Sequence, residues 1–187
     1  TTDCPEEAEA VRRFRNHNMN NDSRQREENQ QWFYRIEDLG YNYRLSDIQC
    51  ALGISQLKKA HLWVARKETL ARCYEELLAG TAIAPLRTLP QLGHARHLFV
   101  VRLPEDVSRE NVFRKMRDQG IGVNVHYLPV HLHPFYRSRF GTRPGQCPIA
   151  EAASLRILSL PLYPKMTEGD VEEVVTLLKK AVADSGH

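Results

Sequence analysis

The stretch with the clearest chemical potential is Gly40-Tyr41-Asn42-Tyr43-Arg44-Leu45-Ser46-Asp47-Ile48-Gln49. Asn42 carries an amide donor and Arg44 a guanidinium, and both groups can bind an anion at a helix entrance. Ser46 and Gln49 have the spacing of a capping box, which predicts that a helix begins here. Gly40 is expected to give the loop freedom before the cap. The alternative is that Asn42 only shapes a turn and Arg44 only pairs with a carboxylate.

A second candidate site lies at Asn124-Val125-His126-Tyr127. Residues 121–127 alternate apolar and polar side chains, which predicts a strand. The strand pattern breaks at Pro129, so His126 and Tyr127 are expected at a strand end, where side chains commonly line sites. The alternative is an ordinary pair of side chains on the surface of a sheet.

The eight histidines raise the question of a metal site. His131 and His133 are two residues apart near His126, and His94 and His97 are three apart. Zinc requires three or four converging ligands, and no cysteine or carboxylate lies in phase with these histidines. We therefore predict no metal site. The sequence also lacks a Gly-x-Ser-x-Gly motif, a cysteine beside a histidine and a glycine-rich phosphate loop.

The lysines decide whether this chain could hold an amine-type cofactor by itself, because such chemistry needs a desolvated lysine. Lys165 lies in a Pro-Lys turn, and the other six lysines lie on charged helix surfaces. No lysine occurs at a strand end or in an apolar context. We therefore assign no catalytic residue to this chain.

Composition limits the class of protein. The chain has 187 residues with 42% hydrophobic and 26% charged residues, which is typical of one globular domain or two small ones. The net charge of +3 is small and acids are interleaved with bases, so no nucleic-acid partner is expected. No apolar run approaches the roughly 20 residues of a membrane span, so no membrane partner is expected either. Four cysteines without metal spacing indicate a reduced, cytoplasmic protein, with Cys50 and Cys73 as small core residues.

The first half of the chain predicts two helices and a long polar loop. Residues 5–15 should form a helix with Ala8, Val11 and Phe14 facing inward, residues 16–30 a loop, and residues 31–36 a strand-like return. Residues 46–79 predict one long helix that ends at Gly80, buried between layers in its first third and amphipathic after that. Its length of about 50 Å suggests that it crosses between two domains.

The second half predicts a small α/β domain, a short sheet with helices on one face. The expected elements are a strand at 97–103, a helix at 108–119 capped by Ser108, and a strand at 121–127. A loop at 128–145, a helix at 147–158, a short extended piece at 159–162 and a final helix from Thr167 to Ala183 follow.

Taken in order, these segments resemble the DegT/StrS family of pyridoxal-phosphate-dependent nucleotide-sugar aminotransferases. The resemblance covers nearly the whole chain and is most specific in the Gly-x-Asn-x-Arg-x-Ser-Asp block. The details are most similar to the transaminases of pseudaminic acid synthesis, which aminate a UDP-linked 4-keto-6-deoxy sugar. The matching segments are Phe14-Arg15-Asn16-His17, residues 40–53, residues 56–59, residues 95–101, Val125-His126-Tyr127-Leu128-Pro129-Val130-His131 and residues 158–164.

The resemblance implies the C-terminal part of a fold-type I aminotransferase. Residues 1–45 would be the tail of the large cofactor-binding domain, 46–80 the long connecting helix and 81–187 the small C-terminal α/β domain. The family's cofactor lysine and the aspartate that pairs with the pyridine nitrogen would lie upstream of Thr1. This chain alone is then expected to be inactive and to bind no pyridoxal phosphate covalently.

The resemblance also implies roles for the candidate residues. In the family, the asparagine matching Asn42 reaches across a homodimer toward the cofactor phosphate and the substrate, and Arg44 is its neighbour. The strand end from Asn124 through Val125 and His126 to Tyr127 would lie against the nucleotide sugar, and the loop from His17 to Trp32 near the site. The sequence differs from the family pattern at Asn18, where the family usually has glycine.

The expected activity is the transfer of an amino group, usually from glutamate, to a nucleotide-linked keto-deoxy sugar. The expected partners are the N-terminal half, a second copy in a homodimer, the nucleotide sugar and the amino donor. Two alternatives remain open at this point. One is an inactive remnant that dimerises or binds a partner through the long helix, and the other is a family dehydratase, in which histidine replaces the cofactor lysine.

Overall fold

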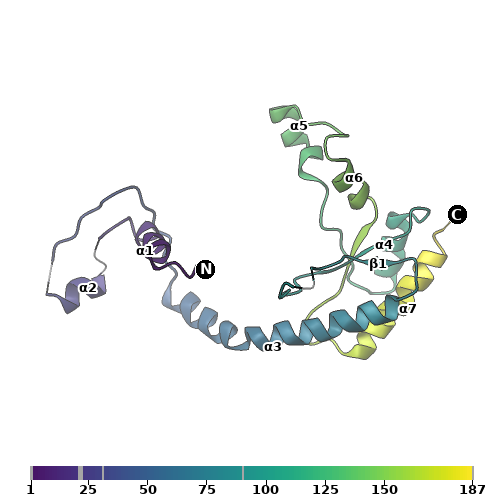
Figure 1. Ribbon diagram of the computed structural model, residues 1–187, viewed down its shortest axis with the longest axis horizontal. Helices are drawn as coiled ribbons and strands as arrows, with labels where there is room; N and C mark the ends of the chain where they lie inside the picture. Colours follow the sequence, from purple (N-terminus) through teal and green to yellow (C-terminus); the bar gives the residue numbers. More distant parts are fainter. Residues whose placement is uncertain (1, 21–22, 31, 90, 187) are drawn as a thin grey trace. The chain divides into compact units, whose positions relative to one another are not determined.

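The computed structural model describes residues 2–20, 23–30, 32–89 and 91–186, and its chain divides into two compact units (Figure 1). Unit 1 comprises Thr1–Lys58 and unit 2 comprises Lys59–His187, so the division falls within one helix. Each unit is described by itself below. Among the described residues, no helix combines the length and the apolar character that crossing a membrane would require.

Unit 1 contains α1 (Pro5–Phe14), α2 (Ser23–Glu28) and the start of α3 (Asp47–Leu78). Helix α1 agrees with its predicted bounds within one residue, and its cap is Cys4, whose thiol donates to Glu6 Oε2 at 3.0 Å but caps no backbone N–H. Helix α2 lies within the predicted loop, because a short polar helix has no apolar periodicity to reveal it. Residues 32–36 form no strand beyond one bridge between Ile36 and Met19, and Gln31, the first residue of that prediction, lies outside the described residues.

The connection between α1 and α3 is held by backbone pairing rather than by a strand. The N–H groups of His17 and Asn20 donate to the carbonyls of Tyr41 and Arg35, at 3.0 and 3.1 Å. In return, Tyr43 N–H donates to the Arg15 carbonyl at 2.9 Å. The residues after α1 and those before α3 therefore lie side by side.

Several apolar residues of this unit are exposed, against expectation. Helix α1 has no buried residue, and the exposed fraction of Val11 is 62%. In α3, Ile48 is 83% exposed and Cys50 is also exposed, although this part was expected to be buried. The apolar pattern was recognised correctly, but no described residue of unit 1 covers these side chains.

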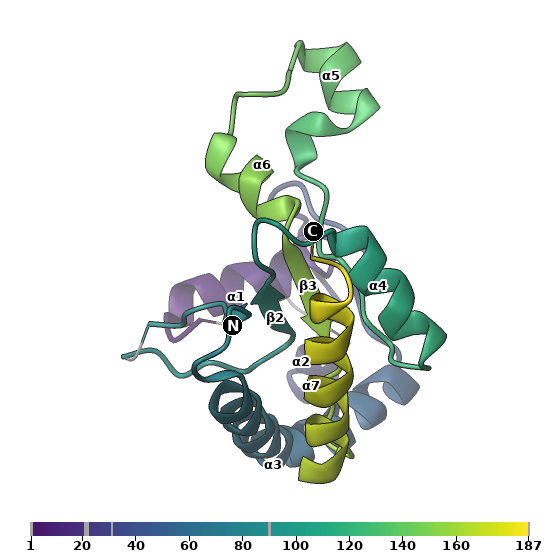
Figure 2. The same ribbon diagram turned by 90° about the vertical axis from the view of Figure 1, so that its right-hand side faces the viewer.

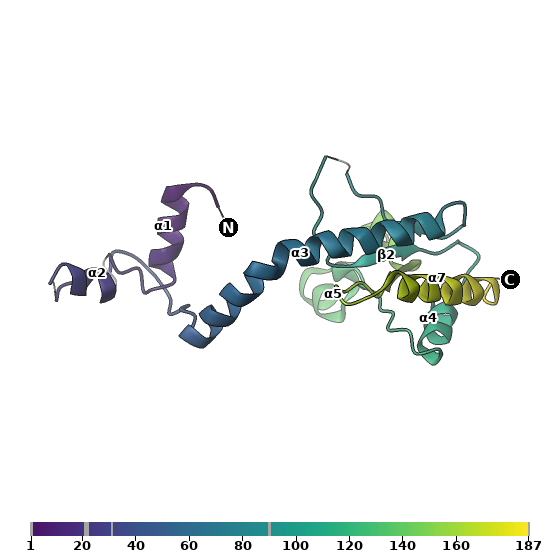
Figure 3. The ribbon, with the colours of Figure 1, turned by 90° about the horizontal axis from the view of Figure 1, so that it is seen from below.

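Helix α3 has 32 residues and begins and ends within one residue of its predicted bounds (Figure 3). Its predicted N-terminal capping box is present, because Ser46 N–H donates to Gln49 Oε1 at 2.8 Å and Gln49 N–H donates to Ser46 Oγ at 3.4 Å. The chain leaves the helix through Gly80, whose φ of 73° lies in the left-handed region.

Unit 2 is built on a three-stranded antiparallel sheet of β1 (Ala84–Pro85), β2 (Phe99–Arg102) and β3 (Ile157–Leu160), in the order β1-β2-β3. Phe99 pairs with Leu160 and Val101 with Leu158, and all four side chains are buried. Their neighbours Val100 and Arg102 are less buried. The face that carries these four side chains is therefore buried, as predicted for the side of a sheet that packs on helices, while on the opposite face Ser159 is also buried.

Besides the C-terminal part of α3, unit 2 contains the helices α4 (Arg109–Asp118), α5 (Pro134–Phe140), α6 (Pro148–Ser154) and α7 (Glu168–Ala183), with a short 3₁₀ turn η1 (Val130–Leu132). Helices α4 and α7 lie side by side next to the sheet (Figure 2). Their predicted caps are present: Ser108 Oγ accepts from Asn111 N–H, and Thr167 forms a capping box with Asp170.

Three predictions for this unit were wrong. Residues 121–127 form no strand beyond one bridge between Asn124 and Ser159, because only one pair of backbone groups meets there. Residues 128–145, expected as a loop, contain η1 and α5, since Pro134 suits a first helical turn. The helix expected at 147–158 ends at Ser154, and the following residues join the sheet as β3.

The core joins the C-terminal part of α3, the sheet, α4 and α7. Leu70, Tyr74 and Leu78 of α3 are buried, and Cys73 and Leu77 pack against them, as expected for the amphipathic part of this helix. Tyr74 stacks on Phe99 at 4.6 Å between ring centroids, and its hydroxyl donates to the Pro161 carbonyl at 3.0 Å. Burial raises the pKa of this hydroxyl.

Two arginines of unit 2 connect its elements through carboxylates. Arg66 of α3 contacts Glu168 of α7 at 2.5 Å, and its guanidinium also donates to the Met166 carbonyl. Arg96, which is nearly buried, contacts Glu68 at 2.9 Å and Glu75 at 3.2 Å. These hydrogen bonds from arginine hold the pKa of Glu68 and of Glu168 below its usual value.

Acid is therefore expected to destabilise unit 2. A carboxylate with a lowered pKa in the folded state contributes stability above its unfolded pKa, and this contribution is lost as the pH falls through the folded pKa. The melting temperature should fall as the pH drops below about 4.5, the ordinary value for Glu68. Calorimetry of Glu68→Gln should show a weaker pH dependence, whereas the surface control Glu110→Gln should follow the parent chain. Equal slopes in all three proteins would contradict this account.

Candidate functional site

The first group of candidate residues forms a polar corner directly before α3, made of Asn16, Asn42 and Arg44. Arg44 Nε donates to Asn42 Oδ1 at 2.9 Å, and Arg44 Nη1 donates to Asn16 Oδ1 at 3.1 Å. Asn16 and Asn42 also form a backbone bridge. The structure thus places Asn42 and Arg44 in contact with each other, and it adds Asn16, which sequence reasoning did not assign to the site.

The corner is fixed by an aromatic cluster beside it. Tyr41 and Tyr43 stack at 5.0 Å with an angle of 9° between their rings, and Phe14 of α1 meets the edge of Tyr41 at 5.2 Å. The alternation of aromatic and polar side chains in Tyr41-Asn42-Tyr43-Arg44 follows the two faces of an extended backbone. One face therefore carries the rings, and the other carries the amide and the guanidinium.

Gly40 is needed here for a different reason than predicted. A Cβ on Gly40 would lie 2.2 Å from the backbone N of Asn18 and 2.5 Å from the carbonyl carbon of His17. Such distances are impossible between packed atoms, so only glycine allows the two segments to approach. The need is for space rather than for conformational freedom.

Asn18 preserves the turn where the family pattern has glycine. His17 and Asn18 have φ values of 58° and 52°, in the left-handed region that asparagine tolerates better than most residues. The Asn18 side chain also donates from Nδ2 to the Leu39 carbonyl at 3.4 Å. The departure from glycine is therefore accommodated by a residue suited to the same backbone.

The donor set of the corner suits a phosphate group. Because Asn42 Oδ1 already accepts from Arg44, the remaining polar group of this side chain is its Nδ2 donor. Arg44 binds amide oxygens through Nε and Nη1 and has no carboxylate partner among the described residues, so its charge is not neutralised. Both side chains are exposed. An amide donor and an uncompensated guanidinium are the chemistry that binds phosphate in proteins.

The second group, Asn124 to Tyr127, is positioned by β3. Asn124 exchanges backbone hydrogen bonds with Ser159, at 3.1 and 2.8 Å, and His126 Nδ1 contacts Ser159 Oγ at 2.8 Å. Val125 packs its side chain against the core. Tyr127 is 72% exposed and meets the edge of the His126 ring at 4.7 Å. The structure thus presents His126 and Tyr127 together.

Ser159 was not found by sequence reasoning, although it carries a signal. It is a polar residue inside the apolar run Leu158-Ser159-Leu160, and it is 3% exposed. A buried hydroxyl needs a hydrogen-bond partner, and the His126 ring supplies it. A single polar residue inside an apolar strand could therefore have predicted a hydrogen bond to the nearby polar segment that contains His126.

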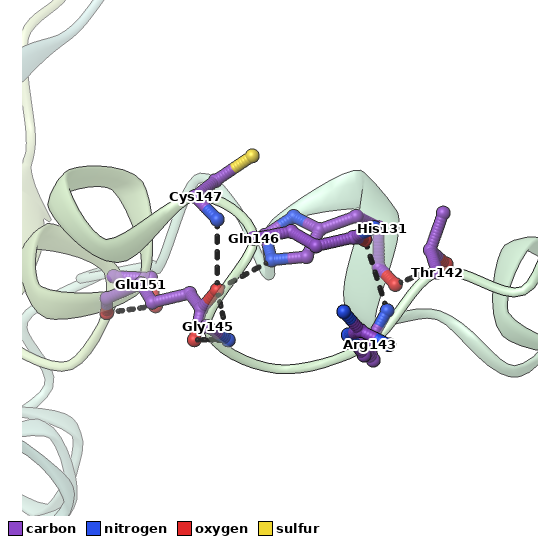
Figure 4. A network of polar contacts seen from close by, with 8 residues as sticks. His131, Thr142, Arg143, Gly145, Gln146, Cys147 and Glu151 are labelled. Carbon is purple, nitrogen blue, oxygen red and sulfur yellow. Dashed lines mark hydrogen bonds and ion pairs between the residues drawn. The ribbon is translucent and has the colours of Figure 1, made fainter.

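His131, one of the histidines considered for a metal, has a different partner. Its Nε2 contacts Glu151 Oε1 at 2.8 Å, and Glu151 also accepts from the N–H groups of Gly145 and Cys147 (Figure 4). The Gly145 N–H, His131 and the Cys147 N–H lower the pKa of Glu151, in that order of effect. Among the described residues, no group of three or more histidine, cysteine or acidic side chains could hold a metal ion.

All seven lysines are at least partly exposed, and the partly buried Lys115 donates to the Asp184 carbonyl. Nothing in their surroundings resembles the desolvated pocket that a cofactor-binding lysine requires.

Comparison with known proteins identifies relatives along the whole chain. A model of the DegT/DnrJ/EryC1/StrS aminotransferase family matches residues 1–179. The uncharacterized protein MJ1066 from Methanocaldococcus jannaschii is 38% identical over 190 residues, which cover 99% of this chain and 49% of that protein. The spore coat polysaccharide biosynthesis protein SpsC from Bacillus subtilis is 34% identical over 188 residues, covering 97% and 48%. This chain spans about half the length of these relatives.

A solved structure shows which half is matched. PseC from Helicobacter pylori, an aminotransferase involved in the biosynthesis of pseudoaminic acid, superposes with a TM-score of 0.82 at 25% identity. The match covers 98% of this chain and 48% of PseC, and it lies on the C-terminal half. The predicted fold class is therefore confirmed: a long helix and a small α/β region with a short sheet.

Proposed function

Because the chain belongs to the DegT/DnrJ/EryC1/StrS aminotransferase family, we propose that it is the C-terminal part of a sugar aminotransferase. In this proposal, the whole enzyme transfers an amino group from glutamate to a nucleotide-linked keto-deoxy sugar. The family uses pyridoxal phosphate, which supplies an electron sink for amino transfer when it is bound. Similarity to SpsC and PseC supports a sugar substrate and a role in polysaccharide biosynthesis.

The observation that carries this proposal is the polar corner. Asn42 and Arg44 offer an amide N–H and an uncompensated guanidinium at the start of α3, and they fit the phosphate of the cofactor. In the proposed homodimer they act on the site of the second copy, and Asn42 also contacts the substrate there. The large number of exposed apolar side chains in unit 1 is consistent with burial against further polypeptide.

The second group supplies the sugar-nucleotide contacts in this proposal. His126 is oriented by Ser159, and Tyr127 presents an exposed ring and hydroxyl beside it. Asn124 adds an exposed amide, and Val125 contributes through its backbone. These groups can bind and orient a sugar or a nucleotide by stacking and hydrogen bonding, and they leave proton transfer to the other half of the enzyme.

The proposal extends to the organisation of the protein. In this proposal, residues 1–45 form the last part of the large cofactor-binding domain. Residues 46–80 form the long helix that connects the two domains, and residues 81–187 form the small C-terminal domain. The N-terminal half supplies the lysine that holds the cofactor, so the 187 residues alone neither transfer amino groups nor retain pyridoxal phosphate after borohydride reduction. The four free cysteines are consistent with a cytoplasmic enzyme.

The test is an activity measurement on the natural polypeptide that carries these residues. With glutamate and a UDP-linked 4-keto-6-deoxy sugar, Asn42→Ala and Arg44→Ala should each lower kcat/KM by about 10- to 100-fold, because each removes a hydrogen bond to a charged group. Added pyridoxal phosphate should restore part of the activity, since the loss includes cofactor affinity.

Arg114→Ala is the matched control, because Arg114 is an exposed arginine of α4 whose ion pair with Glu110 spans 3.8 Å. It should leave kcat/KM unchanged. If Asn42→Ala and Arg44→Ala left the transamination rate unchanged, the polar corner would have no role in the active site. A natural polypeptide that catalyses no amino transfer to any keto sugar would overturn the proposed function.

A further inference from the structure

The exposed segment Tyr127–Val130, called the arch here, lies between two fixed attachments. Tyr127, Leu128 and Val130 are each at least half exposed. Before the arch, Asn124 and His126 are bound to Ser159 of β3 through the backbone and the imidazole. After the arch comes His131, which has its own set of partners. An exposed segment of four residues is therefore fixed at both ends.

The second attachment is stronger than an ordinary surface contact. The His131 ring contacts Glu151 Oε1 at 2.8 Å, and the His131 carbonyl accepts from Thr142 Oγ1 at 2.7 Å. Figure 4 shows both contacts converging on His131. The side chains of His131 and Glu151 are only 13% and 21% exposed, which limits competition from water. Side chain and backbone of His131 are thus held independently.

Glu151 organises the side-chain part of this attachment, whereas Thr142 holds the His131 carbonyl. Besides His131, the two oxygens of Glu151 accept from Gly145 N–H at 2.9 Å and from Cys147 N–H at 3.1 Å. Glu151 belongs to α6, which is followed directly by β3, the strand that carries Ser159. One continuous stretch, residues 151–159, therefore provides the partners for both ends of the arch.

We propose that Glu151 is a positioning residue that holds the arch, and with it Tyr127, in the conformation that receives the nucleotide part of the substrate. This inference rests on the proposed function for the identity of the ligand. The geometry of the clamp itself is independent of that function. Glu151 touches no substrate in this account and acts through His131.

The clamp can be tested by NMR on the natural polypeptide that carries these residues, which is the parent protein below. Glu151→Ala should increase amide exchange of Gly145 and Cys147 by about tenfold to hundredfold, because hydrogen bonds to a carboxylate are lost. The Tyr127 ring and amide resonances should shift or broaden as well. Glu151→Gln keeps one acceptor oxygen and should restore much of the parent spectrum, and Glu172→Ala on α7 should leave Tyr127 unchanged. Exposed Gly145 and Cys147 amides with unchanged Tyr127 resonances would overturn the proposal, leaving Glu151 as a local loop contact.

Ligand binding provides the second readout, with UDP as the probe. UDP should shift Tyr127 in the parent chain and in Glu151→Gln, and it should bind about tenfold more weakly to Glu151→Ala, with unchanged core resonances such as those of Tyr74. If UDP binds the parent and Glu151→Ala equally, the positioning role is overturned. If UDP does not shift Tyr127 even in the parent, the proposed nucleotide contact fails, while the Tyr127 spectrum of Glu151→Ala still decides whether the clamp exists.

Discussion

Replacing Gly40 with alanine is expected to separate the segment that follows α1 from the segment that precedes α3. The added methyl group would lie 2.2 Å from the Asn18 nitrogen, and both neighbours are backbone atoms that cannot move aside alone. Overpacking usually costs about 1–3 kcal/mol and occasionally more. No described hydrophobic residue of unit 1 is buried, so little packing energy offsets such a cost and the pairing should be lost.

The measurement is amide exchange of His17 and Tyr43, whose N–H groups bond across the two segments. In Gly40→Ala both amides should exchange as fast as in an unstructured chain. The control is Gly53→Ala, because nothing beyond the backbone of its own helix turn lies within 4 Å of the added methyl group, and the residue lies two turns inside α3. That substitution should stabilise the helix by about 0.5–1 kcal/mol. If the His17 and Tyr43 amides of Gly40→Ala remained protected from exchange, the two segments would have room for a methyl group and the described contact would be wrong.

The same substitution should affect function if the polar corner acts as proposed. Asn16 and Asn42 belong to the two segments that Gly40 allows to meet, and Arg44 bonds to both side chains. Separating the two segments would break the hydrogen bond between Arg44 and Asn16, so the guanidinium would remain present but would no longer be held in place. An enzyme carrying Gly40→Ala should therefore lose activity as severely as Arg44→Ala, although no binding group is deleted.

Replacing Tyr74 with alanine is expected to be the most destabilising change in unit 2. Tyr74 is fully buried, stacks on Phe99 and donates to the Pro161 carbonyl. Removing a buried aromatic ring costs about 3–5 kcal/mol, because contacts are lost and a cavity remains. The melting temperature of the chain should fall by roughly 10 °C, as measured by circular dichroism.

Two further variants separate the causes. Tyr74→Phe keeps the ring but leaves the Pro161 carbonyl without its donor, so it should cost about 1–3 kcal/mol. Tyr163→Ala removes a tyrosine of the same unit that is 52% exposed and should change stability by at most about 0.5 kcal/mol. A Tyr74→Ala chain as stable as Tyr163→Ala would show that the core does not depend on this ring.

Much of the fold follows from local signals in the sequence. Ser46 with Gln49, Ser108 and Thr167 each marked a helix start that the structure contains, because capping depends on residues three apart and not on distant contacts. The amphipathic pattern predicted for the later part of α3 is confirmed by the burial of Leu70, Tyr74 and Leu78. The strand predicted at residues 97–103 is present as β2, Phe99–Arg102.

The errors have physical causes as well. Residues 121–127 alternate like a strand, but a strand also needs a partner, and β3 offers only Ser159 to this segment. The exposed start of α3 shows the opposite case, an apolar pattern without a covering layer among the described residues. The pattern of apolar residues indicates which side chains favour burial. It does not indicate whether another segment is present to cover them.

The candidate site was predictable in part. Asn42 and Arg44 were recognised by type and order, and the structure brings them into contact. Asn16 was missed because its partner lies 28 residues away. The contact between His131 and Glu151 was missed for the same reason, since the turn containing Gly145 that joins them has no periodic signal. Contacts between residues that a loop separates in the sequence become evident only in the three-dimensional structure.

The edges of the small sheet have a consequence for how this chain behaves in concentrated solution. Strand β1 has two residues, and Pro85 has no N–H to offer to another strand. On the other side, the outward N–H and carbonyl of Ser159 are already bonded to Asn124. Neither edge is a ready template for cross-β growth. Self-association at high concentration is therefore expected to bury exposed side chains such as Ile48 and Leu57, and to remain reversible by dilution.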